Sequence, residues 1–213
     1  MPTLQQHYSL LPPVIRLLLI SNVLIFFLQP AFADTLIGNF ALWPLYDTML
    51  AANLPIHGEF APWQLLSYAF LHGNLMHLIL NMYALWLFGV ALENLWGSRN
   101  FAIYYLVCVL GAALTQLLVT AYSGEIYPTI GASGGVFGVL LAFGLFFPNQ
   151  VLLLLIPPVP IRAKYFVLLY GAVELVFGVT GTDAGVAHFA HLGGMLFGFL
   201  LILSALQHPP RRR

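Results

Sequence analysis

A serine within a glycine-rich stretch is the first candidate for chemistry in this sequence. Ser133 lies in GASGG, residues 131–135, which fits the G-x-S-x-G pattern of hydrolases that expose a nucleophilic serine on a strand-to-helix turn. No strand-like segment precedes this stretch, and a long apolar run follows it. We therefore interpret Ser133 as a nucleophile at the start of a helix, and such a nucleophile requires a base from elsewhere in the chain.

The candidate for that base is a histidine far downstream. His188 and His191 lie one helical turn apart, and a G-x-x-x-G pair follows His191 on its own helical face. A second such pair begins directly after Ser133. Because glycines at this spacing let membrane helices approach closely, we predict a crossing that brings His191 Nε2 to Ser133 Oγ. The glycines are Gly134, Gly138, Gly194 and Gly198, and Gly131 is expected to free the backbone that enters the helix.

A third group of polar residues offers donors for the charge that a serine attack creates. Asn74, His77 and Asn81 are spaced by three and four residues, so they share one face of a predicted helix. The backbone N–H of Ser133, in the first turn of its helix, has no intrahelical acceptor. We predict that His77, Asn81 and this N–H stabilise the oxyanion of a scissile carbonyl.

Composition indicates a polytopic membrane protein. Apolar residues make up 61% of the 213 residues and charged residues only 7%, whereas soluble domains carry about 25% charged residues. The formal net charge of +0 gives no electrostatic reason to expect a nucleic-acid partner. The single cysteine, Cys108, cannot form an internal disulfide. We expect an all-α membrane protein with a single domain over residues 1–213.

Six apolar segments are the expected membrane spans. They are residues 14–28, 74–92, 101–121, 132–147, 165–179 and 186–203. All seven Lys and Arg residues fall on one side of this arrangement, so the positive-inside rule puts both termini in the cytoplasm. His77, Ser133 and His191 then lie at similar depth near the outer ends of alternate helices. Two shorter apolar pieces, residues 60–71 and 151–156, are expected at the interface or against the bundle.

The three polar motifs together resemble those of the rhomboid intramembrane serine proteases, over residues 60–198. HGNLMHLILNM is similar to the family's His-and-Asn motif, GASGG holds its nucleophile, and AHLGGMLFG matches A-H-x-x-G-x-x-x-G. The resemblance makes Ser133 the nucleophile and assigns the base to His191 rather than His188. It also gives His77 and Asn81 the oxyanion positions.

This resemblance implies a six-helix rhomboid-like bundle that cleaves transmembrane segments of membrane-protein substrates in a bacterial inner membrane. The expected site is a Ser-His dyad with no acid, no metal and no cofactor, so His191 must be oriented by packing. The helix over residues 165–179 becomes a lateral gate, residues 181–185 a cap, and residues 34–67 a membrane-embedded first loop. GVALENLWG resembles the family's G-x-x-x-E-x-x-x-G, which makes Glu93 a structural hydrogen-bonding residue.

The sequence departs from the family's pattern at two positions. Trp63-Gln64 stands where members often have Trp-Arg, and this change affects the bond that anchors the first loop. Phe137 stands where some members have tyrosine, so its ring can pack under His191 but cannot donate a hydrogen bond. Glu174 lies within a predicted span without an obvious partner, and Asp183 in an outer loop is the alternative acid for His191.

Other interpretations stay open at this level. A catalytically inactive relative that binds membrane clients is the non-enzymatic alternative. A metal enzyme is disfavoured because no H-E-x-x-H or paired His-x-x-x-His motif is present. The histidines that could suggest a metal enzyme are His72, His77, His188 and His191. PAFAD, residues 30–34, resembles a signal-peptidase site, but the weak charge before it favours a retained first helix.

Overall fold

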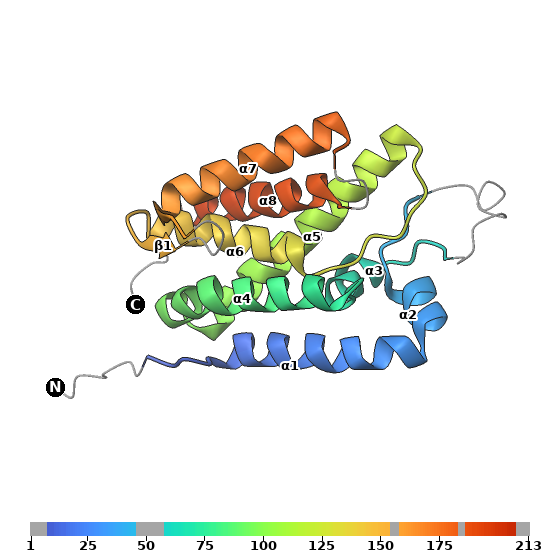
Figure 1. The fold of residues 1–213 in the computed structure, drawn as a ribbon, viewed down its shortest axis with the longest axis horizontal. Coiled ribbons are helices and arrows are strands. Elements are labelled where there is room, and N and C mark those ends of the chain that lie inside the picture. The colour runs from blue at the N-terminus through green and yellow to red at the C-terminus, as the bar shows by residue number, and fades with distance from the viewer. Residues whose placement is uncertain (1–7, 46–57, 154–157, 183–185, 208–213) are drawn as a thin grey trace.

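Long apolar helices run side by side through most of the molecule (Figure 1). The computed structural model describes residues 8–45, 58–153, 158–182 and 186–207. Its principal helices are α1 (Pro13–Leu28), α4 (Leu75–Trp96), α5 (Ser98–Ser123), α6 (Ser133–Phe146), α7 (Ala163–Thr180) and α8 (His188–Gln207). Each overlaps one predicted span, and the expectation of an all-α membrane bundle is confirmed.

Within the described residues, five helices are long and apolar enough to cross a membrane, and α6 is the exception. Its 14 residues extend only about 21 Å, whereas the hydrocarbon core of a bilayer is about 30 Å thick. Figure 1 shows that α6 begins part-way along its neighbour α5, beside the first turn of α8. The first residue of α6 is therefore recessed inside the bundle.

The segment that leads into α6 is held in place by backbone hydrogen bonds to the first loop. Leu42 and Thr129 form an isolated antiparallel bridge, with N···O distances of 2.9 Å in both directions. Two residues later, the Gly131 N–H donates to the Tyr68 carbonyl oxygen at 3.0 Å. These bonds let an irregular chain enter the bundle with its polar groups paired, and they set where α6 starts.

The described part of the connection between α1 and α4, which includes the first loop, contains short helices. They are η1 (Gln29–Ala31), α2 (Ala33–Phe40), α3 (Gln64–Ser67) and η3 (Tyr68–Phe70). Gln64 is buried, accepts from the Trp43 N–H at 3.1 Å and donates to the Glu59 carbonyl at 2.9 Å. Glutamine thus anchors this loop where an arginine is common in the resembled family.

Asn74 has a local role that differs from the prediction. It was expected on the polar face of a helix with His77 and Asn81, but it lies before α4 as its N-cap. Its Oδ1 accepts a hydrogen bond from the His77 backbone N–H at 2.8 Å. A capping asparagine satisfies one of the free N–H groups of the first turn, and this structural role accounts for Asn74.

A short hairpin between α6 and α7 was not predicted. β1 (Val151–Leu153) pairs antiparallel with β2 (Pro160–Arg162), and Leu152 lies opposite Ile161. From the sequence, residues 151–156 are expected to form one interfacial apolar piece, and residues 154–156 lie outside the described part. Three residues are too few for a pattern to separate strand from interfacial segment, so only the pairing identifies this hairpin.

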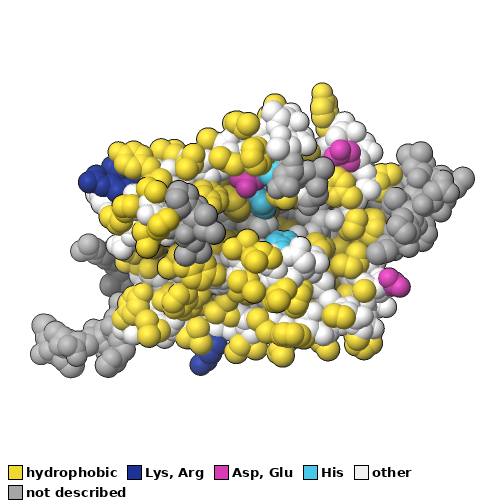
Figure 2. Space-filling view, in the orientation of Figure 1, with side chains coloured by type: hydrophobic (Ala, Val, Ile, Leu, Met, Phe, Trp, Pro, Cys, Tyr) yellow, Lys and Arg dark blue, Asp and Glu magenta, His cyan; other side chains and the backbone are white. Residues whose placement is uncertain are grey.

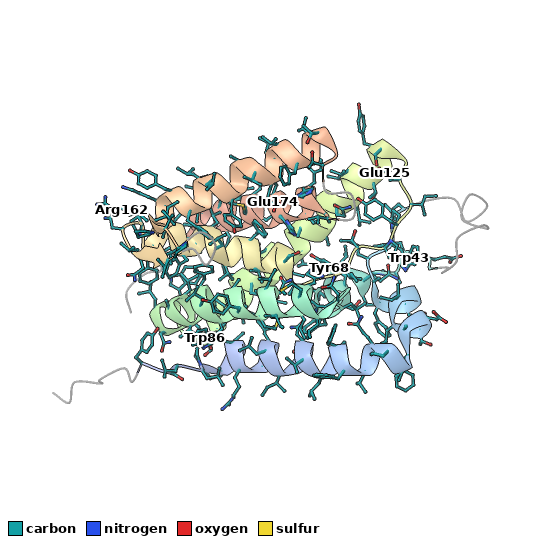
Figure 3. The ribbon with its side chains drawn as sticks, in the orientation of Figure 1. Trp43, Tyr68, Trp86, Glu125, Arg162 and Glu174 are labelled. Atoms are coloured by element: carbon teal, nitrogen blue, oxygen red, sulfur yellow. The ribbon has the colours of Figure 1, made fainter. Side chains whose placement is uncertain are left out.

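Charged side chains are scarce on the visible face and gather near its two ends (Figure 2). Basic groups appear at the end where the described chain begins and on the lower edge, whereas acidic groups appear toward the other end. Figure 3 places the labelled Arg162 at the first end and the labelled Glu125 at the second. Another acidic group lies beside histidines midway along the molecule, and Figure 3 identifies Glu174 at that level on α7.

Candidate active site

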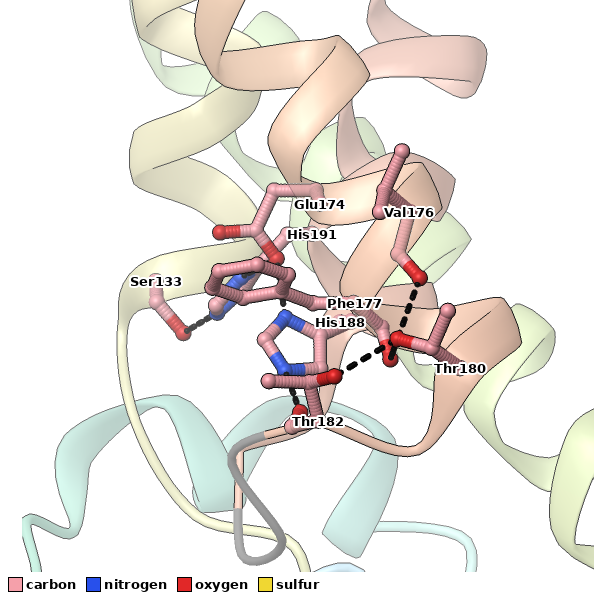
Figure 4. Close-up of polar contacts among 8 residues, drawn as sticks. All are labelled: Ser133, Glu174, Val176, Phe177, Thr180, Thr182, His188 and His191. Carbon is pink, nitrogen blue, oxygen red and sulfur yellow. Dashed lines mark hydrogen bonds and ion pairs between the residues drawn. The ribbon is translucent and has the colours of Figure 1, made fainter.

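The first residue of α6 and the first turn of α8 bring a hydroxyl to an imidazole. Ser133 Oγ lies 2.7 Å from His191 Nε2, although the two residues are 58 positions apart (Figure 4). His191 is buried, and Ser133 is partly exposed. This is the distance and the atom pairing expected of a nucleophile and the base that takes its proton.

The crossing of α6 and α8 depends on glycine at its point of closest approach. A β-carbon added to Gly194 would overlap the backbone carbonyl group of Gly134. Gly138 and Gly198 also lie close to α5, because a β-carbon added at either position would meet Cys108. The predicted glycine contact between the two helices is therefore present, and α5 completes it as a third packing partner.

His77 lies beside the turn that precedes the serine. Gly131 has φ of +126°, and a β-carbon there would lie 2.8 Å from His77 Nε2 and 3.6 Å from Ser133 Oγ. Only glycine fits this conformation and this spacing. The Gly73 N–H approaches His77 Nδ1 at 3.5 Å, so Nδ1 is the acceptor. The hydrogen of a neutral imidazole then belongs to Nε2, the nitrogen near Gly131.

Asn81 lies one turn further along α4 and is less directly connected to the serine. Its side chain is buried, and Nδ2 donates to the His77 carbonyl oxygen at 2.8 Å. No hydrogen bond joins Asn81 to Ser133 in the described part of the chain. An asparagine amide has two N–H donors, so one remains for another acceptor.

Glu174 is the residue whose role the sequence analysis missed. Its Oε2 lies 2.8 Å from His191 Nδ1 and 2.7 Å from His188 Nδ1, in the middle of α7 (Figure 4). The expectation that no acid contacts His191 is wrong. A carboxyl group in an apolar span was a usable signal, because such groups are costly in a membrane and mark functional sites. Asp183, the alternative acid, lies outside the described residues.

The same three side chains form the one group in the described ranges that could ligate a metal ion. Ligand atoms of Glu174, His188 and His191 all lie within 4.8 Å of one another. Ligands of a tetrahedral zinc ion are roughly 3.3 Å apart, from bond lengths of about 2.0 Å. The 2.7 and 2.8 Å contacts are shorter than this and match hydrogen bonds between histidine and carboxylate.

Two further residues singled out from the sequence have clear structural contacts. Glu93 is buried at the far end of α4 and accepts from the Val14 and Ile15 N–H groups at 2.9 and 2.8 Å. Phe137 packs its ring on the imidazole of His191. Glu93 therefore connects α4 to the start of α1, and Phe137 belongs to the surroundings of the site.

Comparisons with known proteins agree with these observations. The model of the Rhomboid domain matches residues 59–208. "Rhomboid protein 1, mitochondrial" of Saccharomyces cerevisiae is 34% identical over 157 residues, which are 68% of this chain and 43% of the yeast protein. This chain thus spans less than half the length of that relative.

Two bacterial relatives match nearly all of the chain. "Putative rhomboid protease YdcA" of Bacillus subtilis is 28% identical over 98% of this chain and 96% of its own length. "Rhomboid protease AarA" of Providencia stuartii is 25% identical over 92% of this chain and 73% of its own length. With several apolar helices, the protein is a multi-pass integral membrane protein. Because the domain match runs from the first loop to the end of α8, this chain belongs to the rhomboid family.

Proposed function

We propose that this protein is an intramembrane serine endopeptidase in which Ser133 is the nucleophile and His191 the general base. The observation that carries the proposal is the 2.7 Å separation of Ser133 Oγ and His191 Nε2 within a bundle of apolar helices. Family membership supports the same reaction class, because relatives named as proteases match almost the entire chain.

The reaction follows from the roles of these two atoms. His191 Nε2 takes the proton of Ser133 as Oγ forms a bond to the scissile carbonyl carbon, and the carbonyl electron pair moves to its oxygen. The tetrahedral intermediate collapses, the C–N bond breaks, and His191 returns the proton to the leaving amine. Water then repeats the sequence on the acyl-enzyme and releases the second product.

The oxyanion is held by His77, Asn81 and the backbone N–H of Ser133 in this proposal. The contact of His77 Nε2 with the Gly131 turn supports its part, because a donor there lies close to the attacked carbonyl. Asn81 takes part through its second N–H. Removal of a single oxyanion donor in a serine protease costs about 10²–10³-fold in kcat, so we expect His77→Ala and Asn81→Ala to lower turnover within this range.

The substrates are transmembrane segments of other membrane proteins. A helix in a bilayer pairs all its backbone groups internally, so a scissile carbonyl becomes accessible only where the helix unwinds. The short α6 supports this assignment, since it sets the serine within the depth of the bundle. Segments with helix-destabilising residues near the outer membrane face are the expected substrates, entering between α4 and α7.

The proposed orientation has both termini in the cytoplasm of a bacterial cell. Among the described basic residues, Arg16, Arg99, Arg162 and Lys164 support it by the positive-inside rule, because they adjoin helix ends on one side. In this orientation the start of α6 lies toward the outer side, from which the water for hydrolysis comes.

Cleavage of a model transmembrane substrate by the purified full chain in liposomes tests this function. We expect cleavage by the wild-type protein and none by Ser133→Ala or His191→Ala. His188→Ala should retain measurable turnover, because the Ser133–His191 pair does not include it. Undiminished cleavage by Ser133→Ala would overturn the proposal, and wild-type protein that binds the substrate without cleaving it would favour a binding role instead.

A further inference from the structure

A reaction catalysed by Ser133 and His191 alone does not account for the contact between Glu174 and the two histidines. Glu174 lies in the middle of an apolar helix, and its side chain is only 12% exposed. Burying a carboxyl group in a membrane bundle is costly unless it is paired and hydrogen-bonded. Because Oε2 contacts both His188 and His191, this acid is paired within the candidate site itself.

The tautomer of His191 depends on the group that faces each ring nitrogen. A base that receives the serine proton on Nε2 must have that nitrogen unprotonated before the reaction. The hydrogen of the neutral ring then resides on Nδ1, which faces Glu174 Oε2 at 2.8 Å. An acceptor at this position favours the Nδ1–H tautomer over the unreactive Nε2–H tautomer. Glu174 therefore selects the reactive form of His191.

His188 explains how a carboxyl group is tolerated in an apolar helix. Its Nε2 faces the carbonyl oxygen of Thr182 at 3.1 Å, and because a carbonyl only accepts, Nε2 carries a hydrogen. Its Nδ1 faces Glu174 Oε2 at 2.7 Å. One proton is then shared between that nitrogen and that oxygen. Wherever the proton resides, the pair of Glu174 and His188 has no net charge, and Oε2 still accepts from His191.

From these contacts we infer that Glu174 is a positioning residue that completes a Ser133–His191–Glu174 triad, with His188 as the neutralising partner of the acid. This inference rests on the proposed protease function. Glu174 holds His191 in its reactive tautomer and stabilises the imidazolium formed when Ser133 attacks. It neither gives nor takes a proton during the cycle, so the proton and bond changes of the reaction stay those of serine and histidine.

The experiment compares Glu174→Gln with wild-type protein and with the control Thr180→Val. Glutamine has the same shape as glutamate and keeps one acceptor, but it lacks the charge and adds an N–H group. The Thr180 hydroxyl lies on the same helix and has no hydrogen bond to either histidine among the described residues; it bonds to Val176 O and Thr182 Oγ1. The measurements are kcat and KM for a transmembrane substrate, the rate of Ser133 labelling by a fluorophosphonate, and the melting temperature.

We expect Glu174→Gln to lower kcat by about 10²-fold or more with KM little changed, as for the loss of general-base function. Fluorophosphonate labelling should fall in parallel, because it reports the nucleophilicity of Ser133 without a bound substrate. Thr180→Val should match wild type. If Glu174 only held α7 against α8, Glu174→Gln would change the melting temperature but leave kcat and the labelling of the folded enzyme intact. This result would overturn the inference.

A second measurement needs no variant. Nuclear magnetic resonance of the wild-type protein with ¹⁵N-labelled histidine should show His191 protonated on Nδ1 and unprotonated on Nε2 at neutral pH. An Nε2–H tautomer for His191 would overturn the inference. Failure of the proposed protease function would give a different result. Cleavage that persists in Ser133→Ala overturns the protease mechanism and the triad together, whereas Ser133-dependent cleavage that survives Glu174→Gln overturns the role of Glu174 alone.

Discussion

The ring of Phe137 lies flat against the imidazole of His191, with ring centroids 4.3 Å apart and an angle of 7° between the planes. Phe137 is one turn after Ser133 on α6, so one helix supplies both the hydroxyl and the surface that supports its partner. With Glu174 at Nδ1 and Ser133 at Nε2, the imidazole is held along two edges and on one face. Packing and hydrogen bonding together determine its orientation.

Replacing Phe137 tests the contribution of this stacking. Phe137→Leu keeps an apolar side chain but removes the flat ring, and stacked aromatic pairs contribute about 0.5–1.5 kcal/mol. We expect kcat to fall by roughly two- to tenfold, with a larger loss in Phe137→Ala. Phe137→Tyr keeps the ring and should retain wild-type turnover. Equal kcat values for the leucine, tyrosine and wild-type proteins would show that stacking does not position His191.

Gly194→Ala tests the crossing that joins α6 to α8. The added methyl group would overlap the backbone of Gly134, which cannot move aside as a flexible side chain does. The helices must separate, so Ser133 and His191 move apart. We expect a loss of about 1–3 kcal/mol in stability, typical of overpacking, together with a large loss of cleavage, measured by thermal unfolding and substrate turnover.

Gly171→Ala is the matched control for this substitution. Gly171 also lies within a helix, but the nearest atom to an added β-carbon is the terminal methyl of Met195 at 3.4 Å. The flexible methionine side chain can adjust, so stability and turnover should stay close to wild type. If both alanine variants behaved alike, the close approach of Gly194 and Gly134 would not be what brings Ser133 and His191 together.

Glu93→Gln should destabilise the protein without changing its chemistry. The carboxylate accepts from two backbone N–H groups at the start of α1 and from Ser98 Oγ at 2.6 Å. The amide of glutamine would point a donor at one of these donors, which costs about 1–3 kcal/mol for a buried group. Unfolding midpoints should fall relative to Glu125→Gln, an exposed control. Turnover per folded molecule should be unchanged, and a specific loss of kcat would contradict this structural role.

His72 is expected to make the protein less stable in mild acid. It lies between η3 and α4, and only 1% of its surface is exposed. Burial lowers the pKa of His72 from 6.5 to about 4, and the nearby His77 adds to this shift. Between these two pH values the unfolded chain binds more protons than the folded protein does. Acidification through this window therefore lowers the free energy of unfolding.

The expected loss from His72 is up to about 3 kcal/mol when the pH falls from above 6.5 to about 4. Denaturation midpoints measured across this window should decline more steeply for the wild-type protein than for His72→Leu, which has no titratable group there. Parallel pH profiles for the two proteins would show that another group is responsible.

Several features followed from the sequence because they depend on local pattern. The apolar runs predicted the principal helices, since a helix that spans a bilayer needs a continuous apolar length. The three polar motifs predicted which side chains would meet, and Ser133 and His191 do meet. Their roles in catalysis stay predictions until the variants are measured. The hairpin of β1 and β2 was missed because its strands are too short to have a periodicity.

The tertiary structure alone decided which partners the remaining polar groups have. Glu174 stood in the sequence as a charged residue without a partner, and the crossing of α7 over the first turn of α8 brings it to His188 and His191. Gln64 likewise acquired its role only from the folded first loop. Residue spacing along one helix determines which side chains share a face, but the distance between side chains of different helices depends on crossing angle, register and rotamer. These are set by packing over the whole bundle, which no single motif contains.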